Sequence, residues 1–212
     1  ITMRVLKNYI NSTWTTSANK STVKVMNPAT QELLAKVPIG LGSESDMNDA
    51  INSAHQAYLE WKKVPVLRRV QPLFKLKGLM DENLEDLAET ITLESGKTLE
   101  ESRGELMRAI ENIETACGTP MLIQSEFSED IASGVDEFMI RQALGVTACI
   151  APFNFPAMIT FWFLPYAIAC GNAMVVKPSE KVPLTMTKIF QLLDQLDLPK
   201  GLVNMVHGGK EA

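Results

Sequence analysis

Asn154 is the residue whose surroundings most strongly suggest chemistry. It stands between two aromatic residues and two prolines in Ala151-Pro152-Phe153-Asn154-Phe155-Pro156, within a stretch from Gln142 to Val176 that contains no charged residue. A neutral amide in such an apolar setting can donate a hydrogen bond to an oxygen that becomes negative during a reaction. Asparagine is also a common helix N-cap, and the residue taken alone favours the cap.

A second polar segment, Lys177-Pro178-Ser179-Glu180, follows another apolar run. A lysine donor and a carboxylate acceptor at this spacing can bind the two hydroxyls of a ribose. Taken alone, the segment is better explained as a solvated loop whose glutamate favours a helix N-terminus. Ligands of open α/β sheets lie beyond the carboxyl ends of strands, so the two segments together predict a nucleotide site.

The elements that must position these residues form an alternating series. The pattern predicts strands at 146–151, 173–177 and 202–207, a helix at about 157–170 broken by Pro165, and a helix at 184–196. Strands that alternate with helices at this spacing form a parallel sheet with right-handed crossovers. We therefore expect an α/β fold, a truncated doubly wound (Rossmann-like) parallel sheet, of which residues 146–212 supply the first βαβαβ part.

The preceding residues predict a helical lead-in and a protruding β-hairpin. Residues 1–120 read as a small antiparallel β element with strands at 7–10, 22–26 and 33–37, followed by helices at 46–63, 66–80, 84–95 and 99–117. Ser43 and Asp46 resemble a capping box for the first helix. Residues 121–145 predict an amphipathic hairpin, either a candidate oligomerisation element or an ordinary surface hairpin.

Composition limits the possible partners. The chain has 46% apolar and 21% charged residues, a net charge of −5, three cysteines without a CxxC pair and two histidines. These features indicate a globular domain in a reducing compartment, without a nucleic-acid footprint, a disulfide framework or a metal centre. Prolines and glycines divide the uncharged stretch, so no membrane span is expected. We expect a cytoplasmic location, or the mitochondrial matrix if a transit peptide has been removed.

Several motifs resemble those of the aldehyde dehydrogenase superfamily, in order and in spacing. They are Asn27-Pro28-Ala29-Thr30, Leu93-Glu94-Ser95-Gly96-Lys97-Thr98, Pro152-Phe153-Asn154-Phe155-Pro156, Ala169-Cys170-Gly171-Asn172-Ala173, Val176-Lys177-Pro178-Ser179-Glu180, Pro183-Leu184-Thr185 and Leu202-Val203-Asn204-Met205-Val206-His207-Gly208. Together they cover nearly the whole chain. Within the superfamily, the chain looks most like the CoA-acylating, methylmalonate-semialdehyde dehydrogenase branch. This likeness rests on Phe153, Ala157-Met158-Ile159 and residues 104–112.

The resemblance implies an NAD site and a reaction. Asn154 would stabilise the oxyanion of a thiohemiacetal, and Lys177 and Glu180 would bind the adenosine ribose, where the carboxylate would repel a 2′-phosphate and so favour NAD. Ala151 and Phe153 would flank the cofactor, and Lys181 would line the same cleft. The full-length enzyme would convert malonate or methylmalonate semialdehyde and CoA to acetyl- or propionyl-CoA, CO2 and NADH. It would act as a homo-oligomer, either a dimer or a tetramer.

The resemblance also implies substrate contacts. Phe155 and Trp162 would face the aldehyde tunnel, and Arg108 would hold the substrate carboxylate with its planar fork of donors. The residue pattern alone favours other roles. Arg108 lies off the apolar stripe of its helix and can pair with Glu105 or Glu111, whereas Trp162 stands in an apolar helix and is more often a core residue.

The catalytic nucleophile departs from the family pattern. The family attacks the carbonyl with a cysteine thiolate, and none of Cys117, Cys149 and Cys170 has the expected setting. The family's nucleophile, its general-base glutamate and its catalytic domain come after the last residue of this chain. We therefore expect the chain alone to be inactive. The alternatives are another aldehyde dehydrogenase acting on a different semialdehyde, or a non-catalytic fragment that binds nucleotide or other subunits.

Overall fold

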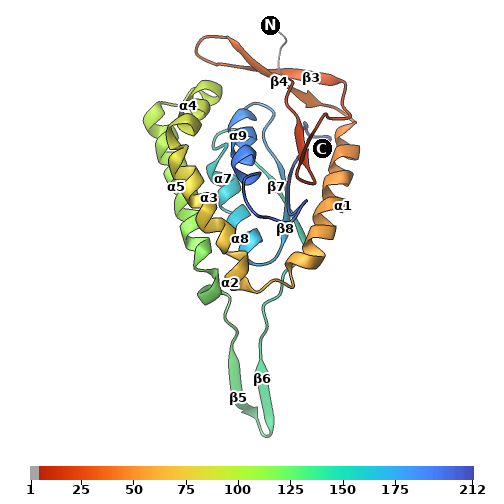
Figure 1. The fold of residues 1–212 in the computed structure, drawn as a ribbon, viewed down its shortest axis with the longest axis vertical. Coiled ribbons are helices and arrows are strands. Elements are labelled where there is room, and N and C mark those ends of the chain that lie inside the picture. The colour runs from red at the N-terminus through yellow and green to blue at the C-terminus, as the bar shows by residue number, and fades with distance from the viewer. Residues whose placement is uncertain (1–4) are drawn as a thin grey trace.

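The main sheet contains five strands, in a computed structural model that describes residues 5–212 (Figure 1). Their order across the sheet is β2 (Thr13–Thr15), β1 (Asn8–Ile10), β9 (Val203–Met205), β8 (Ala173–Lys177) and β7 (Val146–Ile150). β7, β8 and β9 are parallel, whereas β1 pairs antiparallel with both β9 and β2. The predicted α/β fold with a parallel sheet is confirmed, and the N-terminal strands extend that sheet.

The crossover between β7 and β8 contains two short helices instead of one long helix. α7 spans Met158–Phe161 and α8 spans Leu164–Ala169, so the helix is interrupted at Trp162 and Phe163. Pro165 lies in the first turn of α8, where its missing N–H leaves no hydrogen bond unmade. The break predicted from this proline therefore falls just before it. α9 (Leu184–Leu193) connects β8 to β9.

Helices cover both faces of the sheet (Figure 1). They are α1 (Ser43–Trp61), α2 (Val66–Arg69), α3 (Gln71–Glu82), α4 (Leu84–Ser95), α5 (Leu99–Cys117) and α6 (Thr119–Leu122). α1 packs on β7, β8 and β9 from one side, while α3, α4 and α5 lie with α8 and α9 on the other. α5 presents Leu106, Ile110 and Ile113 to the core, and this stripe follows the helical period.

The expected capping box at Ser43 and Asp46 is wrong. α1 begins after Gly42 without a side-chain cap, and Asp46 instead accepts hydrogen bonds from Asn8 (2.9 Å) and Ser17. A capping box is present at α5, where Thr98 Oγ1 accepts from the Glu101 N–H (3.2 Å) and Glu101 Oε2 accepts from the Thr98 N–H (3.0 Å). The starts of α1 and α5 both match the sequence pattern of a capping box. At α1, however, the Asp46 carboxylate bonds to residues distant in sequence instead of to the helix start.

Two hairpins stand apart from the main sheet. β3 (Ser21–Met26) pairs with β4 (Leu33–Ile39), so the predicted N-terminal strands divide between this hairpin and the sheet edge. β5 (Phe127–Ala132) and β6 (Val135–Phe138) form the expected protruding hairpin, whose residues are all exposed (Figure 1). Its part in oligomerisation stays a prediction.

Residues 5–212 contain neither a candidate membrane-spanning helix nor a candidate metal-binding cluster. No helix in the described part, residues 5–212, has both the length and the apolar character that a membrane span needs. Over the same residues, no group of three or more histidine, cysteine, aspartate or glutamate side chains is arranged to hold a metal ion.

Candidate functional site

The two polar segments meet at one edge of the sheet. Ile150, the last residue of β7, lies opposite Lys177, the last residue of β8, and the Ala151 N–H donates to the Lys177 carbonyl at 3.0 Å. The carboxyl ends of these parallel strands therefore bring the Asn154 segment beside the Lys177–Glu180 segment. This is the edge at which ligands of α/β sheets bind.

Asn154 does not cap a helix. α7 begins at Met158, its N-cap residue is Ala157, and no side chain makes a cap hydrogen bond there. The cap favoured by the residue pattern is therefore wrong, and Asn154 is exposed at the sheet edge. An exposed amide at this place is open to an incoming ligand.

The loop that carries Asn154 is held by a buried carboxylate. Glu105 of α5 is 3% exposed, and its Oε1 accepts hydrogen bonds from the N–H groups of Ala157 (2.8 Å) and Met158 (3.2 Å). Its Oε2 pairs with the ammonium group of Lys97, which lies 4.0 Å from the centre of the Phe155 ring. Charge, hydrogen bonds and a cation–π contact thus fix the part of the loop that follows Asn154.

The local sequence pattern does not predict this role for Glu105 and Lys97. The available signal was the position of Glu105 on α5, because it lies on the buried face next to Leu106 and one turn before Ala109. A carboxylate on the apolar face of a helix must find a charged or hydrogen-bonding partner.

Glu94 of α4 binds the start of α9, the helix that follows the second segment, in a similar way. This buried carboxylate accepts hydrogen bonds from the N–H groups of Leu184 (2.7 Å) and Thr185 (2.8 Å) and from the Thr185 hydroxyl, at the first turn of α9. Burial raises the pKa of Glu94 to about 7, although the hydrogen bonds from Thr185 and Leu184 oppose this shift. The start of α9 therefore depends on a group that titrates near neutral pH.

A cavity of about 350 Å³ lies between these supports and Asn154. Its lining residues are Pro28, Glu94, Ser95, Lys97, Phe153, Asn154, Lys181 and Val182. The structure thus brings three of the predicted site residues to one cavity, and the Lys181 ammonium lies 4.7 Å from the centre of the Phe153 ring.

Lys177 is buried beside this edge. Its ammonium donates to the carbonyls of Pro178 (3.0 Å) and Gly208 (3.1 Å) and lies 3.6 Å from Glu180 Oε2. The Glu180 side chain is 39% exposed, so its carboxylate can reach a ligand. His207, 1% exposed, is a close neighbour, and burial followed by the charge of Lys177 lowers the pKa of its ring to about 4. The imidazole is therefore neutral beside the lysine.

The predicted substrate residues are not gathered at one place. Arg108 Nη1 bonds Glu111 Oε2 at 2.8 Å, and its side chain is 69% exposed, which agrees with the solvated pairing expected from the pattern. Trp162 is 46% exposed and lines a cavity of about 330 Å³ with Phe163 and Tyr166, so its expected place in the core is wrong. Trp162 is the C-cap residue of α7 and lies in the break between α7 and α8.

The cysteines do not provide an activated thiol. Cys149 is buried in β7, while Cys117 and Cys170 are partly buried at helix ends. Burial raises the pKa of all three thiols. Since the thiolate is the nucleophile, none of the cysteines in this chain fits that role at neutral pH.

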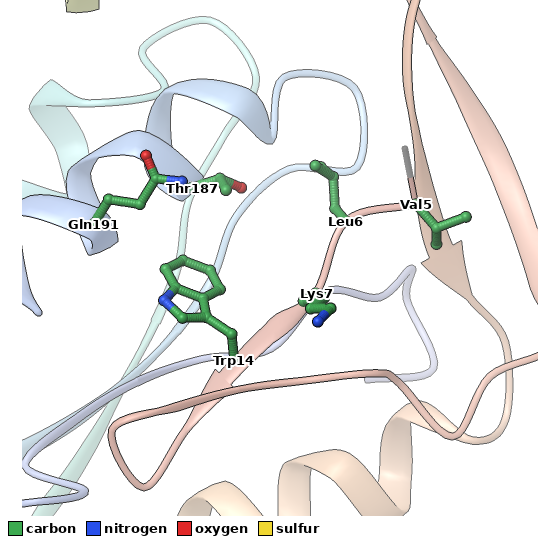
Figure 2. A pocket seen from close by; sticks show the side chains of 6 residues that line it. All are labelled: Val5, Leu6, Lys7, Trp14, Thr187 and Gln191. Atoms are coloured by element: carbon green, nitrogen blue, oxygen red, sulfur yellow. The ribbon is translucent and has the colours of Figure 1, made fainter. Parts of the chain in front are cut away.

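A different cavity lies between the N-terminal segment and α9. It measures about 380 Å³, and Figure 2 shows Val5, Leu6 and Lys7 across from Thr187 and Gln191, with the ring of Trp14 between them. Its lining, as far as the structure describes it, includes none of the predicted site residues. The chemistry therefore concentrates at the carboxyl ends of β7 and β8.

The family model for the aldehyde dehydrogenase family matches residues 14–212. The chain belongs to the aldehyde dehydrogenase family. The malonate-semialdehyde dehydrogenase 2 of Geobacillus thermodenitrificans is 45% identical over 208 residues, which make up 98% of this chain and 43% of that protein. The aldehyde dehydrogenase chain described here thus spans less than half the length of this relative.

Solved structures agree with this assignment. The methylmalonate-semialdehyde dehydrogenase of Oceanimonas doudoroffii has a TM-score of 0.93 and 37% identity, covering 99% of this chain and 42% of that one. A Sinorhizobium meliloti 1021 protein, proposed to be a methylmalonate-semialdehyde dehydrogenase and complexed with NAD, has a TM-score of 0.93 and 36% identity with the same coverage. The fold is that of the N-terminal, Rossmann-like part of aldehyde dehydrogenases.

Proposed function

We propose that this chain is the N-terminal, cofactor-binding part of an NAD-dependent, CoA-acylating malonate or methylmalonate semialdehyde dehydrogenase. The observation that carries the proposal is the 45% identity to a malonate-semialdehyde dehydrogenase over 98% of the chain. The full-length enzyme would convert semialdehyde, CoA and NAD⁺ to acetyl- or propionyl-CoA, CO2 and NADH. The small-molecule substrate is a semialdehyde, and the cytoplasm is the expected location.

The residues at the sheet edge fit a dinucleotide. A ribose diol needs an acceptor and a donor, and Glu180 and Lys177 supply them 3.6 Å apart, with the carboxylate partly exposed. Lys177 has three N–H groups and donates two hydrogen bonds to carbonyls, so one donor remains. Phe153 and Lys181 would flank the cofactor together with the backbone of Ala151. Bound NAD supplies the hydride acceptor, and the negative charge of Glu180 disfavours a 2′-phosphate.

Asn154 would act on the aldehyde oxygen. As a nucleophile adds to the carbonyl carbon, that oxygen gains negative charge, and the Asn154 amide donates a hydrogen bond to it. The amide does not titrate, so its donation is constant with pH. Glu105, which pairs with Lys97, binds the N–H groups that follow Asn154 in its loop. This support keeps the Asn154 amide in place as negative charge develops on the aldehyde oxygen.

Arg108 is the proposed carboxylate-binding residue, together with Phe155 and Trp162 in the aldehyde tunnel. The guanidinium would have to exchange the Glu111 carboxylate for that of the substrate. This pairing is the observation that favours the alternative, an aldehyde dehydrogenase that acts on a different semialdehyde.

The test compares Arg108→Ala with Arg103→Ala in the full-length enzyme. Both arginines lie on α5 and pair with a glutamate, Arg103 with Glu85. We expect kcat/KM for malonate semialdehyde to fall about 10- to 100-fold in the first variant, since a charge-assisted pair contributes about 1.5–3 kcal/mol. The Arg103 variant should keep the wild-type kcat/KM for malonate semialdehyde. Equal kcat/KM in the Arg108 variant and the wild type would reject the carboxylate role and favour the alternative.

A further inference from the structure

A basic cavity lies at the opposite edge of the sheet from Asn154. It measures about 460 Å³ and is bounded by the end of α1, the chain that returns from the β5–β6 hairpin, and the residue that follows α8. Its lining residues are Tyr58, Lys62, Lys63, Arg69, Ile140, Arg141, Gln142, Ala143 and Cys170. This set contains four cationic side chains and, within the described chain, no carboxylate.

Arg69 is the buried cation of this cavity. The residue is 8% exposed, and its Nε and Nη1 donate to the carbonyls of Ala169 (2.9 Å) and Lys62 (3.5 Å). Its Nη2 has no hydrogen-bond partner in residues 5–212, and no carboxylate from these residues forms an ion pair with it. Burial of this unneutralised charge lowers the pKa of Arg69.

The backbone is shaped to leave room for this guanidinium. Gly171 has φ +89°, and a Cβ built on it would lie 2.7 Å from Nη1 of Arg69. A side chain at this position would therefore displace the guanidinium as well as strain the backbone. The cation is held at the cavity by backbone groups instead of an acid.

The neighbouring cations are only partly neutralised. Lys63 pairs with Glu60 at 2.8 Å, and Arg141 lies 3.6 Å from Glu126. Lys62 has no carboxylate partner in the part of the chain that the structure describes, and its ammonium lies 4.7 Å from the centre of the Tyr58 ring. Two positive charges, those of Lys62 and Arg69, thus face the cavity without an opposing charge. An unpaired buried cation is costly, and a bound anion relieves that cost.

We infer that this cavity binds a small oxyanion of the phosphate class, either as the free ion or as the phosphate of a small monoester. Arg69 Nη2 and the Lys62 ammonium supply the charged donors, and the Gln142 amide adds a neutral one. Ile140 and the Tyr58 ring offer apolar surface for the carbon part of a monoester.

Cys170 provides a local reporter for the test, because it lines the cavity. The intact protein, free of phosphate, is alkylated with iodoacetate, and the modified peptides are quantified by mass spectrometry. Inorganic phosphate or phenyl phosphate is added at constant ionic strength, which is kept with NaCl. At ten times the dissociation constant, either probe that binds should slow alkylation of Cys170 about tenfold. Cys117, which is at the end of α5 and outside the cavity lining, is the internal control.

Two variants distinguish a site from a general salt effect. Lys62→Gln removes an unpaired cation from the cavity, and Lys20→Gln removes an exposed lysine elsewhere. We expect Lys62→Gln to bind phosphate at least about tenfold more weakly than the wild type, because a charge-assisted hydrogen bond is lost. Lys20→Gln should show the same protection of Cys170 as the wild type. Stronger protection by phenyl phosphate would identify a monoester as the ligand, and stronger protection by inorganic phosphate the free ion. Unchanged alkylation with both probes, or equal protection in Lys62→Gln and the wild type, would overturn the inference.

Discussion

At the scale of single residues, Asn154 combines exposure with a rigid support. Its loop is held through two N–H groups by Glu105, while its own side chain is exposed. In the full-length enzyme we expect Asn154→Ala to lower kcat about 10²- to 10³-fold, which is the usual loss for one oxyanion donor. Steady-state kinetics measure it, and Asn48→Ala, an exposed asparagine on α1, is the matched control. A kcat within twofold of the wild type would remove Asn154 from the mechanism.

Glu180 should determine the choice of cofactor. Its partly exposed carboxylate lies beside Lys177, so removal of its charge takes away both a ribose acceptor and the repulsion of a 2′-phosphate. We expect Glu180→Gln to raise the KM for NAD about tenfold, because a charged hydrogen bond is lost. The ratio of kcat/KM for NAD to kcat/KM for NADP should also fall. The control Glu82→Gln, at an exposed residue at the end of α3, makes the same change in charge and should leave the KM for NAD unchanged. An unaltered ratio of kcat/KM for the two cofactors would contradict this role.

At the scale of elements, Glu94 links the end of α4 to the first turn of α9. Its folded-state pKa of about 7 lies above the ordinary value of 4.5, so the contribution of its neutral form is fully present below pH 4.5. That contribution is lost as pH rises through 7, by at most about 1.4 kcal/mol for each pH unit between these values. The neutral variant Glu94→Gln should not show this loss.

The measurement is hydrogen exchange of the peptide at residues 183–193 between pH 5 and pH 8, corrected for the intrinsic rate. We expect the protection of the wild type relative to Glu94→Gln to decline over this range. Glu82→Gln again serves as the control. Parallel protection curves for the wild type and Glu94→Gln would show that Glu94 does not titrate here.

The ion pair between Glu105 and Lys97 joins α5 to the loop before it and to the Asn154 loop. Glu105→Leu leaves Lys97 and two N–H groups without an acceptor, so we expect a loss of about 3–5 kcal/mol in the free energy of unfolding. Lys97→Met/Glu105→Leu should cost less than the sum of the single changes. Arg103→Met/Glu85→Leu, at an exposed pair, should cost about 1 kcal/mol or less. Urea denaturation measures all of these, and additive losses at the buried pair would contradict the coupling.

The order and type of most elements could be predicted because their patterns are local. α4 and α5 occupy the expected residues 84–95 and 99–117, and the parallel strands end at the expected polar segments. The supports of the site could not be predicted in this way. Glu94 and Glu105 bind backbone groups that lie 90 and 52 residues away, and a local pattern carries no information about such partners. The false capping box at Asp46 has the same cause, since its partner Asn8 is 38 residues away.

At the scale of the whole molecule, the β5–β6 hairpin exposes large apolar side chains. Phe127 and Phe138 are cross-strand partners, 65% and 68% exposed. We propose that this surface packs against another subunit, because large exposed apolar patches commonly mark protein interfaces. Phe127→Asp should lower the oligomeric state of the full-length enzyme in sedimentation velocity. Leu67→Asp, at an apolar residue of α2 that is 64% exposed, should leave it unchanged. Identical sedimentation of Phe127→Asp and the wild type would exclude the hairpin from the interface.

The pairing of β1 with β9 has a consequence for how the chain is made. The Asn8 side chain accepts a hydrogen bond from the His207 N–H, 199 residues later, and Tyr9 lies opposite Met205. On a ribosome that adds about 5–20 residues per second, the first strand must therefore wait on the order of ten seconds or more for its neighbour to be synthesised. During that time the edge of β1 that later pairs with β9 exposes its N–H and C=O groups, so we expect this strand to be a binding site for a chaperone during synthesis.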